Sequence, residues 1–131
     1  MGNYNIEEAK EHFKKDRFAT DNGMEIVTMS DDEAVTRVVL NDGHKNAYGG
    51  IMGGAIFTLA DLAFAVLSNN RHNLTVAQQV SINYLSAPKG NELTATAHFV
   101  KDGKTTCVIQ VDVTDDTGRD VAMFTGVGFK L

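Results

Sequence analysis

The chain contains one long apolar segment, residues 53–68, in which Asp61 is the single charged residue. The segment is too long for one strand and has no proline, so it predicts a helix. Apolar residues occur around almost its whole circumference, which is typical of a helix buried on every side. A carboxylate in such a place costs free energy unless it is paired, hydrogen-bonded or neutral. Asp61 is therefore a candidate for chemistry.

Much of the remaining chain alternates apolar and polar residues, which predicts strands with one buried face. The expected strands are residues 24–30, 33–40, 74–86, 93–99, 107–113 and 121–129. Asp-Gly at 102–103 and Asp-Thr-Gly at 116–118 mark turns between the later strands. An N-terminal helix is expected at 5–18, and a glycine-rich and asparagine-rich loop at 41–52 leads into the long helix.

This order of elements predicts an α+β fold in which an antiparallel sheet of five to six strands wraps one long central helix. With 131 residues, the chain is expected to form a single domain, residues 1–131, with a short N-terminal helix. A chain of this length can bury about two-thirds of the surface that it exposes when unfolded, which is enough for a real core.

The composition changes this picture mainly by exclusion. It is 43% hydrophobic and 22% charged with a formal net charge of −5, and no basic run indicates binding to nucleic acid. The apolar run is shorter than the roughly 20 residues of a membrane span, and no signal peptide is recognised, so a cytoplasmic protein without a membrane segment is expected. Cys107 is the only cysteine and is expected to pack inward, and the histidine spacing predicts no metal site.

The pair Gly53-Gly54 opens the long helix and supplies a second candidate group. The first N–H groups of a helix have no internal acceptor, and the helix dipole adds positive potential there. Because glycine lets a carbonyl approach the backbone closely, such an N–H could stabilise the oxyanion of acyl transfer. From the pattern alone, close packing is the more economical role for the glycines, and Asp61 fits a structural ion pair as well as chemistry.

The spacing of Gly53 and Asp61 constrains any site that uses both residues. Eight residues at the helical rise place them about 12 Å apart along one axis, too far to serve one carbonyl easily. Two antiparallel helices across a twofold axis could place Gly53 of one chain beside Asp61 of the other, giving two equal sites. An enzyme that uses both residues is therefore expected to be at least a dimer.

The stretch from His44 to Asp61 resembles the hotdog-fold acyl-CoA thioesterases of the PaaI-like (phenylacetic acid degradation) group. The residues that carry the resemblance are Asn46, Gly49, Gly53-Gly54, Phe57, Leu59-Ala60-Asp61 and Ala63-Phe64-Ala65. Weaker matches at 81–85, 101–105 and 120–126 extend it from about residue 18 to the end of the chain. The resemblance implies a long helix wrapped by an antiparallel sheet, and chains that pair into homodimers and often homotetramers.

The resemblance also implies a reaction, the hydrolysis of a medium-chain or aryl acyl-CoA to free acid and CoA without a cofactor. Asp61 would be the nucleophile or the general base that activates water, and the Gly53 N–H of the other subunit would polarise the carbonyl. Asn46 would help to hold the carbonyl or the water. The acyl-CoA would be contacted by Met52, Gly54, Ala77, Tyr84, Lys101, Gly103, Lys104, Thr105 and Thr106, with the two lysines facing the CoA phosphates.

The chain departs from the family pattern at two positions. Met52 stands where the family usually has a histidine before the glycine pair, and Ala77 stands where some relatives carry serine or threonine. His44 could substitute for the missing histidine, although a loop histidine is more often solvated. The alternative function is a non-catalytic acyl-CoA-binding or regulatory protein. A hydratase of this fold is disfavoured, because Val66 stands where such enzymes place a histidine, five residues after the aspartate.

Overall fold

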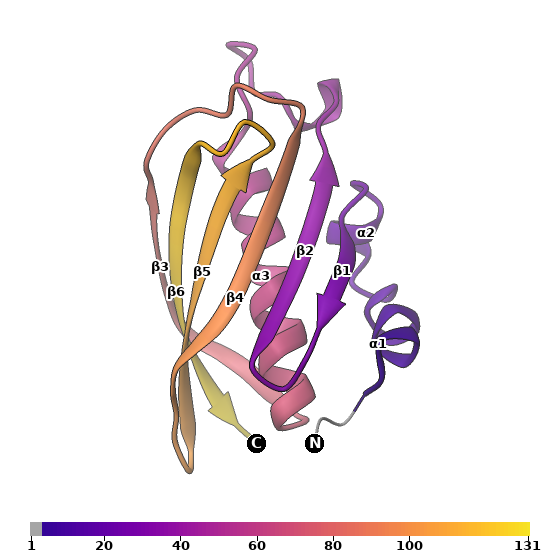
Figure 1. Ribbon diagram of the computed structural model, residues 1–131, viewed down its shortest axis with the longest axis vertical. Helices are drawn as coiled ribbons and strands as arrows, with labels where there is room; N and C mark the ends of the chain where they lie inside the picture. Colours follow the sequence, from indigo (N-terminus) through magenta and orange to yellow (C-terminus); the bar gives the residue numbers. More distant parts are fainter. Residues whose placement is uncertain (1–3) are drawn as a thin grey trace.

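The computed structural model describes residues 4–131. Its sheet has six antiparallel strands in the order β1-β2-β4-β5-β6-β3, and this sheet curves around the long helix α3 (Figure 1). The helices are α1 (Ile6–Phe13), α2 (Arg17–Thr20) and α3 (Gly53–Arg71), with a short 3-10 turn at Asp42–His44. The strands are β1 (Glu25–Met29), β2 (Glu33–Val39), β3 (Thr75–Tyr84), β4 (Glu92–Asp102), β5 (Thr106–Asp115) and β6 (Asp120–Lys130). The predicted α+β architecture and all six strands are confirmed.

The buried face of the sheet packs against α3, as the alternating pattern predicts. Along β5, every second side chain from Cys107 to Val113 is buried, and the residues between them are half-buried. β6 approaches the helix closely at Gly126, where an added Cβ would lie 2.7 Å from the Phe64 ring of α3. Glycine is required there because the ring occupies the space of a side chain.

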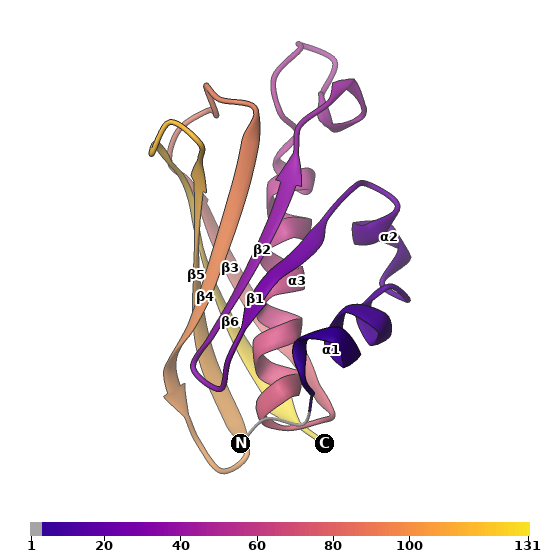
Figure 2. The same cartoon turned by 45° about the vertical axis from the view of Figure 1, so that its right-hand side comes forward.

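The predicted single helix at residues 5–18 is wrong, because the chain turns between Phe13 and Arg17. In one continuous helix Phe13 and Ala19 would lie about 120° apart around the axis. Both side chains are buried, so the turn lets each of them reach the core. The break places Asp16 at the start of α2, and Figure 2 shows α1 and α2 lying beside α3 on the side of the molecule that carries β1.

The expectation that the long helix is buried on every side is also wrong. Gly54, Thr58, Asp61 and Ala65 form a stripe along α3 that is exposed or only half-buried, whereas most of the other helical side chains are buried. Residues spaced by three or four positions share one helix face, and no described part of the chain covers this face fully. Asp61 therefore borders solvent rather than the closed core.

The two edges of the sheet differ in how far they are protected. β1 is a five-residue edge strand whose pairing with β2 has a bulge between Ile26 and Thr28. β3 is a ten-residue edge strand, and Val76, Tyr84 and the following Leu85 expose apolar surface along it. A long apolar edge with free backbone groups is a template for pairing with another strand.

Among residues 4–131, no helix is long and apolar enough to cross a membrane.

Candidate active site

Asp61 lies in a hollow of about 200 Å³ between α3 and the start of α2. The other residues that line it are Asp16, Phe18, Ala19, Phe57, Thr58 and Leu62. No described group donates a hydrogen bond to the Asp61 carboxylate or forms an ion pair with it, and the Thr58 hydroxyl donates instead to the Gly54 carbonyl at 2.7 Å. Burial raises the pKa of Asp61, and the negative charge of Asp16 raises it further. An unpaired carboxylate with a raised pKa is a competent general base.

The first turn of α3 presents a different chemical group. Among the described residues, none accepts a hydrogen bond from the N–H of Gly53 or Gly54. Met52 precedes the helix in an extended conformation (φ −62°, ψ 134°), and its side chain makes no capping hydrogen bond. The free N–H groups and the helix dipole therefore make this end of α3 attractive to a negatively charged or polarised oxygen.

Tyr84 of β3 lies directly against this first turn. Its hydroxyl donates a hydrogen bond to the Gly53 carbonyl at 3.0 Å. A Cβ added at Gly53 would lie 3.0 Å from Tyr84 Cζ, so glycine permits this close approach. Both residues line a hollow of about 330 Å³, together with Ile51, Ile56, Leu85, Ser86, Ala87 and Pro88. Gly53 and Asp61 of one chain thus open into different hollows.

His44 and Asn46 organise the loop that leads into α3. The prediction that His44 is solvated is wrong, because its ring is buried. Its Nδ1 accepts a hydrogen bond from the Asn41 N–H at 3.0 Å, so Nε2 carries the proton and donates it to the Asn22 carbonyl at 2.7 Å. With both nitrogens occupied, His44 ties the loop to the end of α2. Asn46 Oδ1 accepts from the N–H groups of two loop residues, Tyr48 and Gly50.

Met52 borders an apolar hollow of about 280 Å³ at the start of α3. Its terminal methyl lies 3.2 Å from the position of a Cβ at Gly54. The remaining lining residues are Phe18, Asn22, Met24, Gly43, His44, Ala55, Phe57 and Thr58, none of which carries a carboxylate, ammonium or guanidinium group. Three of them, Phe18, Phe57 and Thr58, also line the hollow of Asp61. The two hollows therefore adjoin along one face of α3.

The other predicted contacts with CoA lie elsewhere on the chain. Ala77 is exposed on the edge strand β3, where the pairing with β6 has a bulge. Lys101, Gly103, Lys104, Thr105 and Thr106 form the β4–β5 hairpin, at the opposite end of the molecule from the loop that contains Asn46 (Figure 1). The hairpin adjoins the last turn of α3, because Arg71 pairs with Asp102 at 3.1 Å. Among the described residues Lys101 and Lys104 form no ion pair, so their ammonium groups are available to anions.

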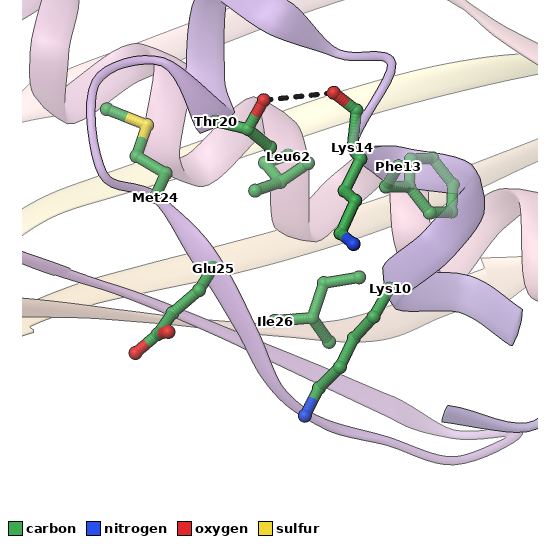
Figure 3. Close-up of a pocket in the computed structure, with 8 residues that line it drawn as sticks. All are labelled: Lys10, Phe13, Lys14, Thr20, Met24, Glu25, Ile26 and Leu62. Carbon is green, nitrogen blue, oxygen red and sulfur yellow. Dashed lines mark hydrogen bonds between the residues drawn. The ribbon is translucent and has the colours of Figure 1, made fainter. Parts of the chain in front are cut away.

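A fourth hollow, of about 270 Å³, lies between α1, α2 and β1 (Figure 3). Phe13, Ile26 and Leu62 line it, and the Thr20 hydroxyl on its border is already bonded to the Lys14 carbonyl at 3.0 Å. Leu62 also lines the hollow of Asp61 and stands between the two spaces. Within residues 4–131 no group of three or more His, Cys, Asp or Glu side chains could hold a metal ion.

Asp16 and Phe18 also line the hollow of Asp61, and neither was a predicted site residue. The single helix predicted for residues 5–18 ran through Asp16, whereas the structure places Asp16 immediately before α2, where an aspartate commonly caps a helix. The Asp16 side chain, however, makes no capping hydrogen bond to α2. Only the tertiary contact of α2 with α3 brings it to Asp61.

Comparison with known proteins identifies the class to which this fold and site belong. Residues 48–122 match the sequence profile of the Thioesterase superfamily. The acyl-coenzyme A thioesterase PaaI of Escherichia coli is 30% identical over 91% of this chain and 86% of its own length. Human acyl-coenzyme A thioesterase 13 is 32% identical over 74% of this chain and 72% of its own length.

Solved structures agree with these sequence matches. The E. coli PaaI protein from the phenylacetic acid degradation operon superimposes with a TM-score of 0.88 at 29% identity, covering 94% of this chain and 90% of that one. A hypothetical thioesterase of Streptococcus pneumoniae, solved with coenzyme A, gives 0.81 at 35% identity over 89% of this chain and 94% of that one. The fold is the hotdog fold. The chain belongs to the thioesterase superfamily, is PaaI-like within it, and is a thioester hydrolase.

Proposed function

We propose that this chain hydrolyses acyl-CoA thioesters at a site completed by two chains. The observation that carries the proposal is the separation of two complementary groups on one helix. Asp61 offers an unpaired carboxylate in one hollow, and Gly53 offers a free N–H in another. A twofold partner with an antiparallel α3 would bring one chain's carboxylate to the other chain's N–H.

In the proposed reaction Asp61 acts as a general base. A water oxygen attacks the thioester carbonyl carbon while Asp61 takes a proton from the water. The N–H of Gly53 from the partner chain holds the oxyanion that develops on the carbonyl oxygen. The C–S bond then breaks, and the proton on Asp61 passes to the departing sulfur, so that the products are the acid and CoA. The raised pKa of Asp61 favours this role over a purely structural one.

The unprotected β3 edge supports the dimer. On the side of this ten-residue strand that faces away from β6, no described strand pairs with the backbone groups, and Val76, Tyr84 and Leu85 are exposed along the edge. Antiparallel pairing of β3 with β3 of a second copy would satisfy these groups and extend the sheet across the twofold axis. Tyr84 would then lie close to the interface while it holds the Gly53 carbonyl.

The acyl group and the CoA phosphates of the substrate are each matched to a region of the chain with suitable chemistry. The apolar hollow bordered by Met52 suits an uncharged aliphatic or aryl acyl group, since none of its lining side chains carries a carboxylate, ammonium or guanidinium group. Lys101 and Lys104 suit the phosphates of CoA. Ten helical residues, about 15 Å, separate Asp61 from the helix end beside their hairpin, a spacing that an extended pantetheine arm can bridge. The relative solved with coenzyme A supports this class of ligand.

The direct test is a panel of acyl-CoA esters, from acetyl to decanoyl and phenylacetyl, monitored for free thiol. The wild type should release CoA with a preference for the larger uncharged acyl groups. Asp61→Asn should lower kcat/KM by at least about 100-fold, because general-base catalysis contributes that much or more. Full activity in Asp61→Asn, with folding and assembly intact, would refute the assignment.

The contribution of the Gly53 N–H can be isolated with a matched pair of variants. Gly53→Pro deletes the N–H at the first helical position, where proline is tolerated, and the extended Met52 is compatible with a following proline. Gly53→Ala adds the same Cβ contact with Tyr84 but keeps the N–H. The proline variant should lose about 100-fold or more in kcat, and the alanine variant much less. Equal losses would assign the effect to packing.

Mixing the variants tests whether the site needs two chains. Co-expression of Asp61→Asn with Gly53→Pro produces mixed dimers that each contain one intact site. Since half of the dimers are mixed, about a quarter of wild-type activity should return. A mixture no more active than its separate components would place both groups within one chain's site.

A further inference from the structure

The turn between α1 and α2 presents a second carboxylate, Asp16, to the hollow of Asp61. The backbone of Asp16 is held on both sides. Its N–H donates to the Phe13 carbonyl at 3.0 Å, and its carbonyl accepts from the N–H groups of Ala19 at 3.1 Å and Thr20 at 3.0 Å. Its carboxylate makes no capping bond to α2. The main chain of Asp16 is thus fixed, while no residue from 4 to 131 forms a hydrogen bond or ion pair with its carboxylate.

Nothing in the hollow neutralises the two carboxylates. The side chains that line it besides Asp16 and Asp61 are uncharged. On α1, His12 faces Asp16 and favours its ionised form, and its ring stacks on Tyr4 at a centroid separation of 5.3 Å. On α2, the Arg17 guanidinium forms an ion pair with Asp21, with an N–O distance of 2.9 Å. From α3, no titratable group other than Asp61 lines the hollow.

Two like charges in one hollow disfavour each other's ionisation. Burial raises the pKa of Asp16. The pKa of Asp61 is raised by burial and also by the negative charge of Asp16. Asp16 is the more exposed of the two, so its carboxyl group ionises first. Its negative charge then disfavours ionisation of Asp61. An ionised Asp16 then makes Asp61 bind a proton more tightly.

We propose that Asp16 is a positioning residue of the active site, a fixed negative charge on the α1–α2 turn that helps Asp61 to take a proton from water. This role of Asp16 in catalysis rests on the proposed function, because it requires that Asp61 takes a proton from water during the reaction. The N-terminal segment is then part of the catalytic apparatus rather than a cover for the sheet. Asp16 itself touches no reacting atom in this scheme.

The pH profile of kcat/KM tests the proposal with Asp16→Asn. Loss of the charge should shift the acidic limb to lower pH, because Asp61 would then ionise more readily. The plateau rate should fall by less than about tenfold, since Asp61 remains in place as a weaker base. Asp16→Glu should retain the wild-type profile. Glu7→Gln, which removes one negative charge from the exposed face of α1, should leave the limb in place.

A measurement without substrate separates this inference from the proposed function. Carbon-13 NMR of labelled aspartate carboxyls, with Asp61 assigned by its absence in Asp61→Asn, follows its titration directly. The midpoint should move to lower pH in Asp16→Asn and stay unchanged in Glu7→Gln. An unchanged midpoint in Asp16→Asn overturns the inference even if the enzyme turns over. A shifted midpoint in a protein that releases no thiol upholds the inference and rejects the proposed function.

Discussion

The hollow of Asp61 and the β5–β6 turn each hold an aspartate in a poorly solvated place, and the two environments act in opposite directions. Asp115, at the end of β5, is 5% exposed. Its oxygens accept hydrogen bonds from the N–H groups of Lys89, Gly90, Thr117 and Arg119 and from the Thr117 hydroxyl. The bond from the Thr117 hydroxyl, followed by the backbone bonds, holds the pKa of Asp115 well below its usual range although burial opposes this.

Within the described residues Asp61 has no such donors, and its pKa is raised by burial and by the negative charge of Asp16. The contrast teaches that burial of a carboxylate does not by itself indicate chemistry. Donors decide whether the ionised form is stabilised for structure or left reactive. Asp115 fastens the turn and the 89–90 segment together, whereas Asp61 keeps its capacity to accept a proton. Four experiments test the difference between the two aspartates.

The largest effect is expected on turnover. Asp61→Asn should lower kcat/KM by at least about 100-fold, whereas Asp115→Asn should keep the wild-type value per folded molecule. Free-thiol release, normalised to the folded fraction from circular dichroism, measures both. A specific loss of activity in fully folded Asp115→Asn would show that the turn also takes part in catalysis.

The next largest effect is expected on thermal stability, which Asp115→Asn should lower and Asp61→Asn should raise. Asp115→Asn replaces an acceptor of five hydrogen bonds by an amide with a single oxygen, so buried N–H groups lose partners and Tm should fall by several degrees. Asp61→Asn removes a carboxylate whose ionised form is disfavoured, so Tm at neutral pH should rise slightly. Thermal unfolding at one protein concentration compares them. A fall in both variants would mean that Asp61 also has a structural partner.

The pH dependence of these differences follows from the directions of the two pKa shifts. The folded pKa of Asp115 is lowered, so its stabilisation is present above the unfolded pKa of about 3.9 and is lost as the pH falls toward the folded value. The folded pKa of Asp61 is raised, so its contribution is complete below about 3.9 and is lost as the pH rises through the folded value.

The Tm deficit of Asp115→Asn should therefore shrink below about pH 4, and the Tm gain of Asp61→Asn should appear only above it. Differential scanning calorimetry from pH 3 to 8 would follow both curves. Tm differences from the wild type that stay constant with pH would contradict the lowered pKa of Asp115 and the raised pKa of Asp61.

The smallest effect on turnover is expected at the first turn of α3, where Tyr84 contacts Gly53. Tyr84→Phe removes the hydrogen bond to the Gly53 carbonyl, worth about 0.5–1.5 kcal/mol, from a half-exposed side chain. The first turn of α3 should loosen, and kcat should fall a fewfold with little change in Tm. Steady-state kinetics on the preferred ester measures it. A loss as large as that of Asp61→Asn would mean that the tyrosine hydroxyl acts on the substrate itself.

Much of the fold could be predicted because its signals are local. Alternating burial in β5 and the length of the apolar run give the strands and the central helix directly. Asp61 and Gly53 stood out because a charge and a glycine pair interrupt a regular pattern. The separation of Gly53 and Asp61 along α3 also followed from the helical rise alone.

The remaining features depend on contacts between distant segments. Nothing around Asp16 in the sequence shows that a turn after Phe13 carries it to α3. Nothing around His44 shows that its ring is enclosed by residues 22 and 41. The exposed stripe on α3 was missed because an apolar composition cannot reveal which face the rest of the chain leaves uncovered.

The close fit of Phe64 over Gly126 and Gly128 has a consequence for how such an enzyme can diverge. A Cβ at Gly126 would meet the ring at 2.7 Å, and one at Gly128 would meet the Cys107 sulfur at 2.8 Å. Side chains added beneath the helix would displace α3 and carry Asp61 with it. On the other side of the hollow, Phe18 is largely exposed, so its side chain can change without moving the helix. A change of substrate is therefore expected to come more easily from substitutions at Phe18 than from substitutions at these two glycines.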